Sequence, residues 1–311
     1  MRNRHMTDLE GDDGPGRFEA RYLAFLETIP QLRPSLIRYC ARMTGSVLDG
    51  EDVVQEALFH AYRKLETFDD ARPLGPWLFR IAHNRCIDFL RRKGVRIDAE
   101  QEVAAPPMVA PVDPPGPALG RAVEHLVLAL PPMERACVLL KDVFDYSLEE
   151  IAELVDSTVG GVKSALNRGR GKLAAAEPSR RPAPPANPEA ARILRLYVER
   201  FNQRDWDGLK TLIAADARLL VADAFAGRLD RSPYFGNYDR LKMPWRLVPA
   251  VLDGEDVIAV LHRGEDGGWY AKYCVRLQIA DDGHITRIAD YGHTPWVRDL
   301  ATGLVHEPLP A

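Results

Sequence analysis

Two proline-rich stretches constrain what this 311-residue chain can fold into more than any other feature. One runs from Ala104 to Pro117 and the other from Pro178 to Pro188. Proline fixes φ and lacks a backbone N–H group, so such stretches interrupt helices and central strands and favour extended linkers. We therefore predict a disordered lead (residues 1–17) and three modules (18–98, 118–176 and 189–305). Two linkers (99–117 and 177–188) separate the modules.

The composition is that of a soluble globular protein. Hydrophobic residues make up 46% of the chain, and the net charge of -4 leaves any nucleic-acid binding to local basic patches. No apolar run reaches the roughly 18 residues of a membrane span, and the N-terminus lacks the apolar core of a signal peptide. The four cysteines have no metal-ligand or redox spacing, which indicates free thiols in a reducing cytoplasm. We expect no membrane partner, no cofactor and no metal.

The first two modules are predicted to be all-helical, because their apolar residues recur with a period of about 3.6 residues. Asp49 is expected to cap the third helix of the first module. The four helices predicted in this module are Phe18–Ile29, Leu32–Met43, Asp49–Leu65 and Pro76–Arg92. The residues predicted on the inner face of the third helix are Val53, Val54, Ala57, Leu58, Ala61 and Tyr62.

The clearest motif lies in the second module. Glu150 follows Ser147 by three residues, the pattern of a capping box in which each side chain satisfies a backbone N–H of the other residue. A turn at Asp156-Ser157 separates this helix from a second one, Thr158–Leu173, which is the spacing of a helix-turn-helix. The residues expected to pack the two helices together are Ile151, Leu154, Val162 and Leu166.

The outward face of that second helix suits DNA. Lysine and arginine can neutralise phosphates or contact guanine, and asparagine can contact adenine. A solvated helix face remains the alternative, because any basic helix has one. The candidate DNA-binding residues are Thr158, Lys163, Ser164, Asn167, Arg168 and Arg170.

The fourth helix of the first module is another candidate DNA-binding element. Its basic residues are interleaved with polar and aromatic ones, which suits single-stranded DNA because phosphates are held while exposed bases stack on aromatic rings. The candidates are Trp77, Arg80, Asn84, Arg85, Asp88, Arg91 and Arg92.

The third predicted helix of the first module begins with an acidic cluster that includes Asp49, Glu51, Asp52 and Glu56. Carboxylates at the start of a helix stabilise its dipole, and the same cluster could equally form a docking face for a protein. The residues alone leave both interpretations open.

Together the two helical modules resemble the extracytoplasmic-function (ECF) sigma factors of bacterial RNA polymerase. Residues 49–57 (DGEDVVQEA), Phe68-Asp69 and residues 76–92 (PWLFRIAHNRCIDFLRR) are similar to region 2 of that family. Residues 130–172 are similar to region 4, and the motifs follow the family's order. The resemblance implies a cytoplasmic protein that binds core RNA polymerase through its β′ clamp helices and β subunit and directs promoter-specific initiation.

The resemblance also implies roles for the candidate residues. Those of the fourth helix would recognise and melt the promoter −10 element, and those of the second module would contact the −35 element. The residues expected to dock on polymerase are Asp49, Asp52, Gln55 and Glu56.

The third module is predicted to be an α+β domain with a curved sheet, because two helical segments precede a series of strands separated by Asp-Gly turns. The helices expected are Pro188–Asn202 and Trp206–Ile213. The strands expected are Ala217–Ala222, Trp245–Val251, Val257–His262, Trp269–Ile279 and Ile285–Tyr291.

Residues 197–213 and 216–219 resemble the opening of SnoaL-like (NTF2-like) domains, which form a cone-shaped α+β barrel around an apolar pocket. In sigma factors that carry such a domain, it regulates activity in cis. The resemblance therefore implies a regulatory domain whose partner is a small-molecule ligand or an intramolecular contact. The Asp-Gly-Gly-Gly-Lys motif of the best-described fused subgroup is absent, so no control residues can be carried over.

A pocket in this fold could be lined by Tyr234, Trp245, His262, Tyr273 and Asp290. A carboxylate beside a tyrosine or histidine can abstract a proton, but ordinary barrel filling explains the same residues, and we expect no enzyme activity. Two alternatives to a sigma factor remain: a helix-turn-helix regulator with a ligand-sensing domain, and an NTF2-like enzyme with accessory DNA-binding helices. Neither requires an acidic docking helix followed by a basic, aromatic one.

Overall fold

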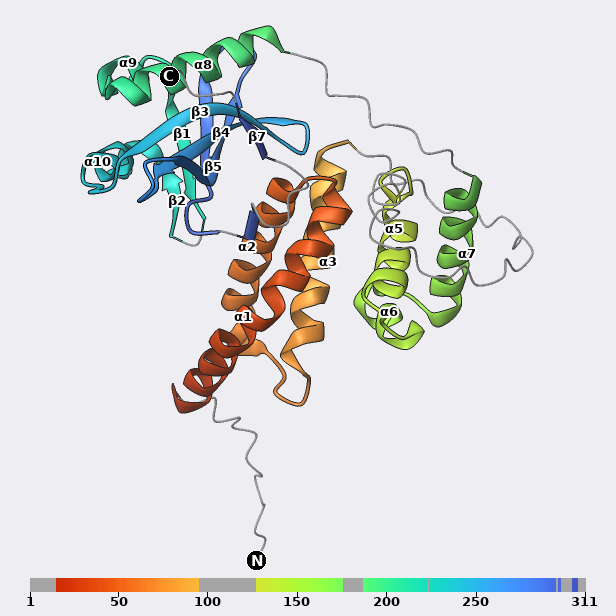
Figure 1. Cartoon of the computed structure of the whole chain (residues 1–311). Coiled ribbons are helices and arrows are strands. Elements are labelled where there is room, and N and C mark those ends of the chain that lie inside the picture. Colours follow the sequence, from red (N-terminus) through yellow and green to blue (C-terminus); the bar gives the residue numbers. More distant parts are fainter. Residues whose placement is uncertain are drawn as a thin grey trace, which may run out of the picture. The chain divides into compact units, whose positions relative to one another are not determined.

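The structure, a computed structural model, describes residues 15–94, 127–175, 187–222, 224–294, 296–297 and 304–306 (Figure 1). The predicted first linker and most of the predicted lead and second linker lie outside these residues. The chain divides into two units. The first consists of Met1–Thr44, Asp52–Pro114 and Leu128–Ala175, and the second of Gly45–Glu51, Pro115–Val127 and Ala176–Ala311. The predicted three-module division remains a prediction.

Helix α1 (Pro15–Thr44) opens the first unit as one continuous helix of 30 residues. The prediction of two shorter helices here was wrong, because Pro30 and Pro34 lie inside the helix instead of ending it. A proline inside a helix removes a backbone hydrogen bond and costs about 3 kcal/mol. Burial offsets that cost, since the turn after Pro34 carries the fully buried Leu36 and Ile37.

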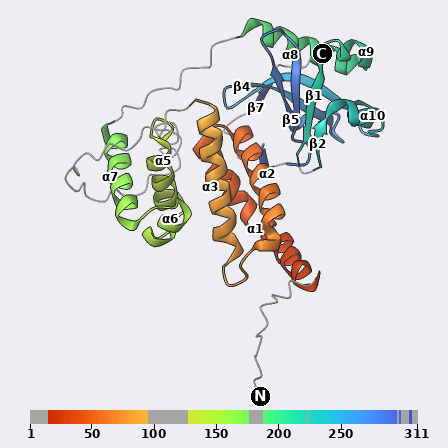
Figure 2. The ribbon, with the colours of Figure 1, turned by 180° about the vertical axis from the view of Figure 1, so that it is seen from behind.

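Helix α2 (Val47–Lys64) starts in the second unit and continues into the first. It is followed by the short 3-10 helix η1 (Leu65–Thr67) and by helix α3 (Leu74–Arg92), which packs along α1 (Figure 2). Asp49 lies in the first turn of α2 and does not cap it, which corrects the prediction. The Asp49 backbone N–H donates to Ser46 Oγ over 3.2 Å, so Ser46 accepts at the start of the helix.

The inner face of α2 is mostly as predicted. Val53, Val54, Ala57 and Ala61 are buried. Tyr62 is the exception, because 45% of it is exposed and its ring meets Tyr22 edge-on at the surface.

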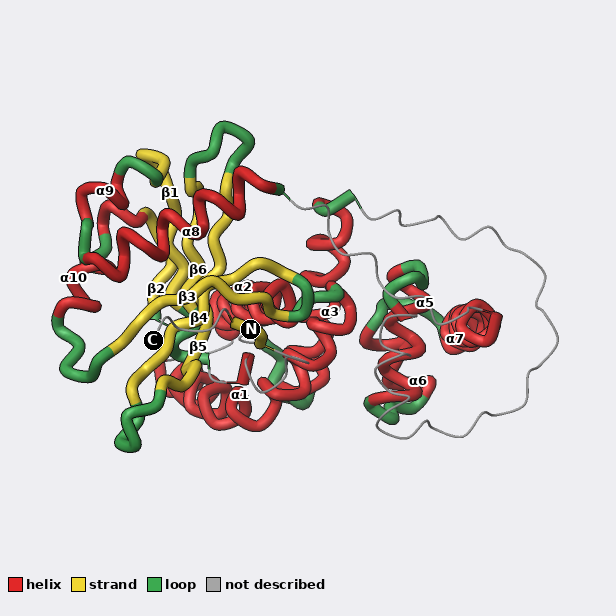
Figure 3. Tube along the Cα trace, turned by 45° about the horizontal axis from the view of Figure 1, so that its top comes forward, coloured by secondary structure: helices red, strands yellow, loops and turns green. Residues whose placement is uncertain are grey.

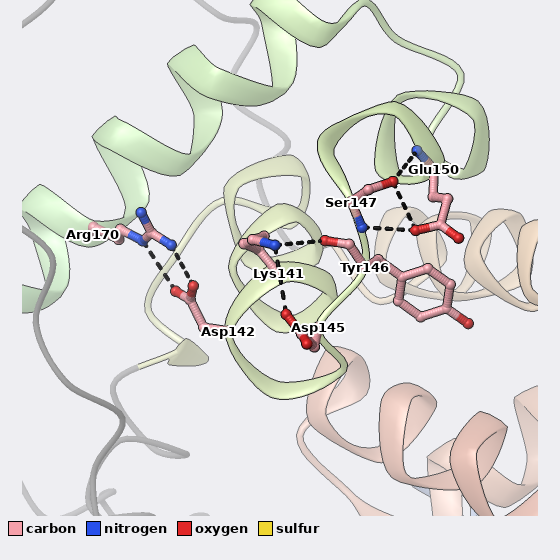
Figure 4. A network of polar contacts seen from close by, with 7 residues as sticks. All are labelled: Lys141, Asp142, Asp145, Tyr146, Ser147, Glu150 and Arg170. Carbon is pink, nitrogen blue, oxygen red and sulfur yellow. Dashed lines mark hydrogen bonds and ion pairs between the residues drawn. The ribbon is translucent and has the colours of Figure 1, made fainter.

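Among its described residues, the first unit continues with α5 (Pro132–Val138), the π-helical η2 (Leu139–Val143), α6 (Leu148–Leu154) and α7 (Val159–Ala175). The predicted capping box is present: Ser147 Oγ accepts from the Glu150 N–H over 3.2 Å, and Glu150 Oε2 accepts from the Ser147 N–H over 2.7 Å (Figure 4). The four residues predicted to join α6 and α7 are all buried, which confirms the helix-turn-helix packing.

The second unit contains the helices and the sheet of the C-terminal part. Its helices are α8 (Pro188–Gln203), α9 (Trp206–Lys210), the 3-10 helix η3 (Leu229–Arg231) and α10 (Tyr234–Asp239). Its strands are β1 (Ile213–Val221), β2 (Phe225–Arg228), β3 (Trp245–Leu252), β4 (Glu255–Arg263), β5 (Trp269–Ile279), β6 (Ile285–Asp290) and β7 (Leu304–His306). The expected α+β domain is confirmed, and β2, α10 and β7 were not predicted.

The strands form one curved sheet in the order β2-β1-β6-β5-β4-β3-β7, and α8 crosses one of its faces (Figure 3). Strands β3 to β6 are antiparallel neighbours in chain order, whereas β1 pairs with β6 in parallel. The turn between β3 and β4 shows how the local sequence favours the antiparallel hairpin of these two strands. Asp253 and Gly254 both have positive φ (50° and 86°), the conformation that a two-residue hairpin turn requires.

Candidate nucleic-acid and protein interfaces

The acidic start of α2 is divided between the two units. Asp49 is 4% exposed, and its Oδ1 lies 2.6 Å from Nη1 of Arg276 on β5. Asp52 and Gln55 are half-buried and Glu56 is exposed. The four residues that the sequence predicts as one docking face therefore have different surroundings: Asp49 is held in a buried ion pair, whereas Glu56 makes a partly exposed one with Arg92.

Helix α3 presents most of its predicted DNA-binding residues outward. Asn84, Arg91 and Arg92 are exposed, while Arg80, Arg85 and Asp88 are half-buried. Each arginine among them lies in an ion pair between partly exposed side chains: Arg80 with Asp156, Arg85 and Arg91 with Asp88, and Arg92 with Glu56, at N–O distances of 3.5, 3.7, 3.5 and 3.4 Å. Exposed pairs of this kind contribute little to stability, so the cations remain available to an incoming polyanion.

Trp77 differs from the other α3 candidates. Its ring packs against Phe68, with the ring centroids 4.7 Å apart, and it joins the apolar cluster beneath α3. The residue is half-buried, so part of the indole still reaches the surface. Trp77 therefore supports the local core as well as the surface on which a base could stack.

The inner face of α3 is anchored by a neutral pair. Tyr39 Oη and His83 Nδ1 lie 2.8 Å apart, and both residues are buried. Burial lowers the pKa of His83 to about 4, because the imidazolium would lose its hydration. At neutral pH this histidine is therefore uncharged and serves as a hydrogen-bond partner inside the helix pair.

An aromatic cluster joins the helix-turn-helix to α1 and α3 within the first unit. The Phe144 ring lies 5.9 Å from Tyr39 and 6.2 Å from Phe79, and Tyr146 lies 5.7 Å from Phe79. Arg135 donates from the same side to the Met43 carbonyl, near the end of α1. Sequence analysis missed this cluster, because single aromatic residues after a short helix carry no pattern of their own.

Helix α7 uses part of its charge internally. Arg168 Nε lies 3.0 Å from Glu134 Oε1, whose side chain is 5% exposed, and Lys172 Nζ lies 2.9 Å from Glu134 Oε2. Arg170 Nε donates to Asp142 over 3.1 Å (Figure 4). Two of the predicted −35 residues are thus tied to α5 and η2.

The remaining DNA-binding candidates at α7 are accessible to solvent. Thr158, Lys163, Ser164 and Asn167 are exposed on one side of the helix start and its first turns. The Gly161 N–H donates to Thr158 Oγ1 over 3.0 Å, so Thr158 accepts at the N-terminus of α7. Lys163, Ser164 and Asn167 form the face with which α7 can meet a DNA groove.

Four of the five predicted pocket residues gather in the second unit around Asp290. This carboxylate is 5% exposed, and its Oδ2 accepts from Tyr234 and Tyr238, each over 2.8 Å. Tyr238 and Tyr273 hydroxyls lie 3.1 Å apart, and the His262 ring stands 6.0 Å from the Tyr273 ring. Burial raises the pKa of Asp290.

The fifth predicted residue, Trp245, donates from its indole N–H to the Tyr238 carbonyl over 3.0 Å. Tyr238 was not predicted as a pocket residue, although it lies on α10 one helical turn after the predicted Tyr234. Tyr234, Tyr238 and Tyr273 form hydrogen bonds with Asp290 or with one another, whereas the buried Nε2 of His262 has no hydrogen-bond partner among the described residues. Whether these residues line a ligand pocket remains a prediction.

Other kinds of site find no support in the described part of the chain. Within it, no three histidine, cysteine, aspartate or glutamate side chains are grouped to hold a metal ion. No helix among the same residues is long and apolar enough to cross a membrane. A cleft of about 330 Å³ lies in the first unit, where none of the predicted site residues lines it; its walls are Ala20, Arg21, Ala24, Phe68, Asp70, Arg72 and Leu74.

Two family models match the helical parts of the chain. Residues 29–96 match the family model of sigma-70 region 2, and residues 120–173 match that of sigma-70 region 4. The chain is 33% identical over 162 residues to the ECF RNA polymerase sigma factor SigW of Bacillus subtilis, covering 48% of this chain and 87% of that protein. It is also 33% identical over 213 residues to the ECF sigma factor SigG of Mycobacterium tuberculosis. That match covers 60% of this chain and spans 58% of the length of SigG.

Solved structures match as well. The Mycobacterium tuberculosis ECF sigma factor SigJ covers 85% of this chain and 95% of its own, at 19% identity and a TM-score of 0.33. An NTF2-like protein of Burkholderia pseudomallei covers 37% of this chain and 98% of its own, at 18% identity and a TM-score of 0.28. Given the SigW match and the two sigma-70 regions in their expected order, this chain belongs to the extracytoplasmic-function family of RNA polymerase sigma factors.

Proposed function

We propose that this chain binds core RNA polymerase and directs transcription initiation at specific promoters. The observation that carries the proposal is the presence of two separate outward polar and basic faces, on α3 and on α7, in the parts that match sigma-70 regions 2 and 4. The chain would contact two DNA elements while a third surface binds polymerase. Because tethering raises the effective concentration of the second DNA contact, the affinity for each DNA element can be modest.

In this proposal α3 recognises and melts the −10 element. Its exposed Asn84, Arg91 and Arg92 supply hydrogen-bond donors and positive charge for a separated strand. Phosphates would be neutralised by the arginines near the C-terminal end of the helix, where cations are also favoured by the helix dipole. Trp77 at the other end offers an aromatic edge for base stacking.

Helix α7 contacts the −35 element. The second helix of a helix-turn-helix enters the major groove with residues of its N-terminal half. In α7 that half carries the exposed Lys163, Ser164 and Asn167, whereas Arg168 is turned toward Glu134. Direct base contacts are therefore assigned to Lys163, Ser164 and Asn167, and Arg168 is assigned to holding the helix.

Polymerase docking is assigned to the part of α2 that lies in the first unit, with Asp52, Gln55 and Glu56 on its accessible side. Carboxylates in this position can meet a basic partner surface and steer its approach. The C-terminal α+β domain is assigned a regulatory role in cis. Supporting that role are the tyrosine hydroxyls that already occupy the Asp290 carboxylate, an arrangement that favours a structural or binding module over a catalyst.

The docking assignment is tested by measuring the affinity of the intact chain for purified bacterial core RNA polymerase. Replacing Asp52 and Glu56 together by alanine should lower that affinity at least tenfold, because two charges of the docking face are lost. The matched control is Glu66→Ala, which removes an exposed carboxylate from η1 instead. Equal affinity of the double variant and the control would contradict the assignment, and no binding of the wild-type chain would contradict the function.

A further inference from the structure

The segment 45–51 is buried although much of it is polar. Ser46, Asp49 and Glu51 are 7%, 4% and 0% exposed, and the apolar Leu48 is 1% exposed. Charged side chains are rarely buried unless they are paired. The segment belongs to the second unit, so its polar partners can be identified there.

Arg276 on β5 is one of these partners. Its Nη1 lies 2.6 Å from Asp49 Oδ1, and its Nη2 lies 2.9 Å from Glu255 Oε2 on β4. One guanidinium thus joins two carboxylates, an arrangement that suits the planar fork of arginine. Burial by itself would lower the pKa of Arg276, but the Asp49 and Glu255 carboxylates raise it, so the guanidinium stays charged.

Trp296 is a second partner of the segment. Its indole N–H donates to Glu51 Oε2 over 3.0 Å, and Glu51 is fully buried. The two acidic residues of the segment are thus held by side chains from different parts of the C-terminal domain. Asp49 and Glu51 flank Gly50 in the sequence. The contacts of Arg276 with Asp49 and of Trp296 with Glu51 therefore hold the start of α2 at two nearby residues.

The sheet face that carries Arg276 is covered. In β5, Val275 and Leu277 point into the core, so Arg276 and Cys274 lie on the opposite face. Cys274 is 4% exposed, and Ala259, its neighbour on β4, is fully buried. An antiparallel sheet commonly leaves one face to solvent, whereas this part of the sheet is buried on both faces.

We propose that Arg276, Glu255 and Trp296 form an intramolecular binding surface for the acidic segment 45–51, and that core RNA polymerase competes with this surface for Asp49. This inference rests on the proposed function, in which the acidic start of α2 belongs to the polymerase-docking helix. Bound to the surface, Asp49 is withheld from polymerase; released from it, Asp49 extends the docking face formed by Asp52, Gln55 and Glu56. The surface is the cis-regulatory device of the C-terminal domain.

The test compares the affinity of the intact chain and its Arg276→Ala variant for core RNA polymerase. Removing the guanidinium leaves the buried Asp49 carboxylate without its arginine, which favours release of the segment. The affinity should rise roughly tenfold, because a larger fraction of the chain is competent to dock. Trp296→Phe, which loses only the indole N–H, should raise it less. The matched control is Arg218→Ala, an exposed arginine on β1, which should leave the affinity unchanged.

A second measurement needs no polymerase. Amide hydrogen exchange of residues 45–51 should be faster in Arg276→Ala than in wild type and in Arg218→Ala. Faster exchange combined with higher polymerase affinity supports the proposal. Unchanged exchange, or faster exchange with unchanged or lower affinity, overturns it. If no variant binds polymerase, the proposed function fails, and the exchange result still decides whether the surface holds the segment.

Discussion

Helices α3 and α7 carry the two proposed DNA-binding faces, and they are anchored in different ways. Helix α3 is held from inside by the uncharged pair of His83 and Tyr39, and the ion pairs of its arginines join partly exposed side chains. Helix α7 is held by ion pairs of Arg168 with Glu134 and of Arg170 with Asp142. A count of positive residues would rank the two faces as similar, but their available charge differs.

The role of a basic residue on a predicted DNA-binding helix therefore depends on the groups that its side chain contacts. Ion pairs between exposed side chains, such as those of Arg91 and Arg92 on α3, leave their cations accessible to an anionic ligand. An ion pair with a buried carboxylate, such as that of Arg168 with Glu134, withholds its cation, so α7 depends more on its uncharged polar residues. Four predictions test this contrast, and they are ordered from the largest expected effect to the smallest.

The neutral anchor of α3 should make the first unit sensitive to acid. The pKa of His83 is about 4 in the folded chain, below its ordinary value of 6.5, so the unfolded chain binds the proton more tightly. The stability that His83 contributes is therefore complete above pH 6.5 and is lost as the pH falls toward 4. The loss should approach about 3 kcal/mol in the free energy of unfolding.

Urea unfolding of wild type and His83→Gln at pH 7 and at pH 4.5 measures this effect. Glutamine keeps a hydrogen-bonding group for Tyr39 but does not titrate, so the variant should lose less stability on acidification. Equal losses in the two proteins would show that His83 is not the source of the acid sensitivity.

The ionic anchor of α7 should be visible as a loss of stability. Arg168→Ala leaves the buried Glu134 with Lys172 alone, and we expect the free energy of unfolding to fall by about 2 kcal/mol. Thermal unfolding at neutral pH measures it, with Lys163→Ala as the exposed control. An unchanged melting temperature together with lost −35 selectivity would instead assign Arg168 to base contact.

Replacing Asn167 should change DNA selectivity and leave stability nearly unchanged, the reverse of the effect expected for Arg168. Its side chain is exposed on α7, so Asn167→Ala should leave the melting temperature nearly unchanged. Loss of a base contact should reduce discrimination between the preferred −35 element and a mutated one by about tenfold. Competition binding of polymerase holoenzyme to the two promoter fragments measures this ratio, and an unchanged ratio would remove Asn167 from the contact face.

The exposed arginines of α3 should affect affinity in a salt-dependent way. Replacing Arg91 by alanine should weaken binding to a −10 strand only a few-fold and should reduce the slope of log affinity against log salt by about one. The same should hold for Arg92. A slope that stays at the wild-type value would mean that neither arginine meets a phosphate.

Much of this fold follows from the sequence because its signals are local. The capping box at Ser147 and Glu150 and the Asp-Gly turn at Asp253 each encode their own geometry. The division of α1 into two helices was predicted wrongly, since tertiary burial outweighs the local cost of Pro30 and Pro34.

The candidate sites were predictable only in part. The exposed faces of α3 and α7 follow from helical periodicity, which determines which side chains point outward. Periodicity does not show which outward residue meets another element, and for that reason the pairing of Arg168 with Glu134 and of Arg276 with Asp49 was missed. Such pairs join residues that lie far apart in the sequence, and one chain offers no local signal for them.

The central claim is that this chain confers promoter specificity on RNA polymerase, and in vitro transcription tests it most directly. Purified core polymerase is incubated with the intact chain and a pool of bacterial genomic fragments, and the 5′ ends of the transcripts are sequenced. We expect transcripts that start downstream of a shared pair of −35 and −10 motifs and that disappear without the chain. Transcript starts that are the same with and without the chain would contradict the account.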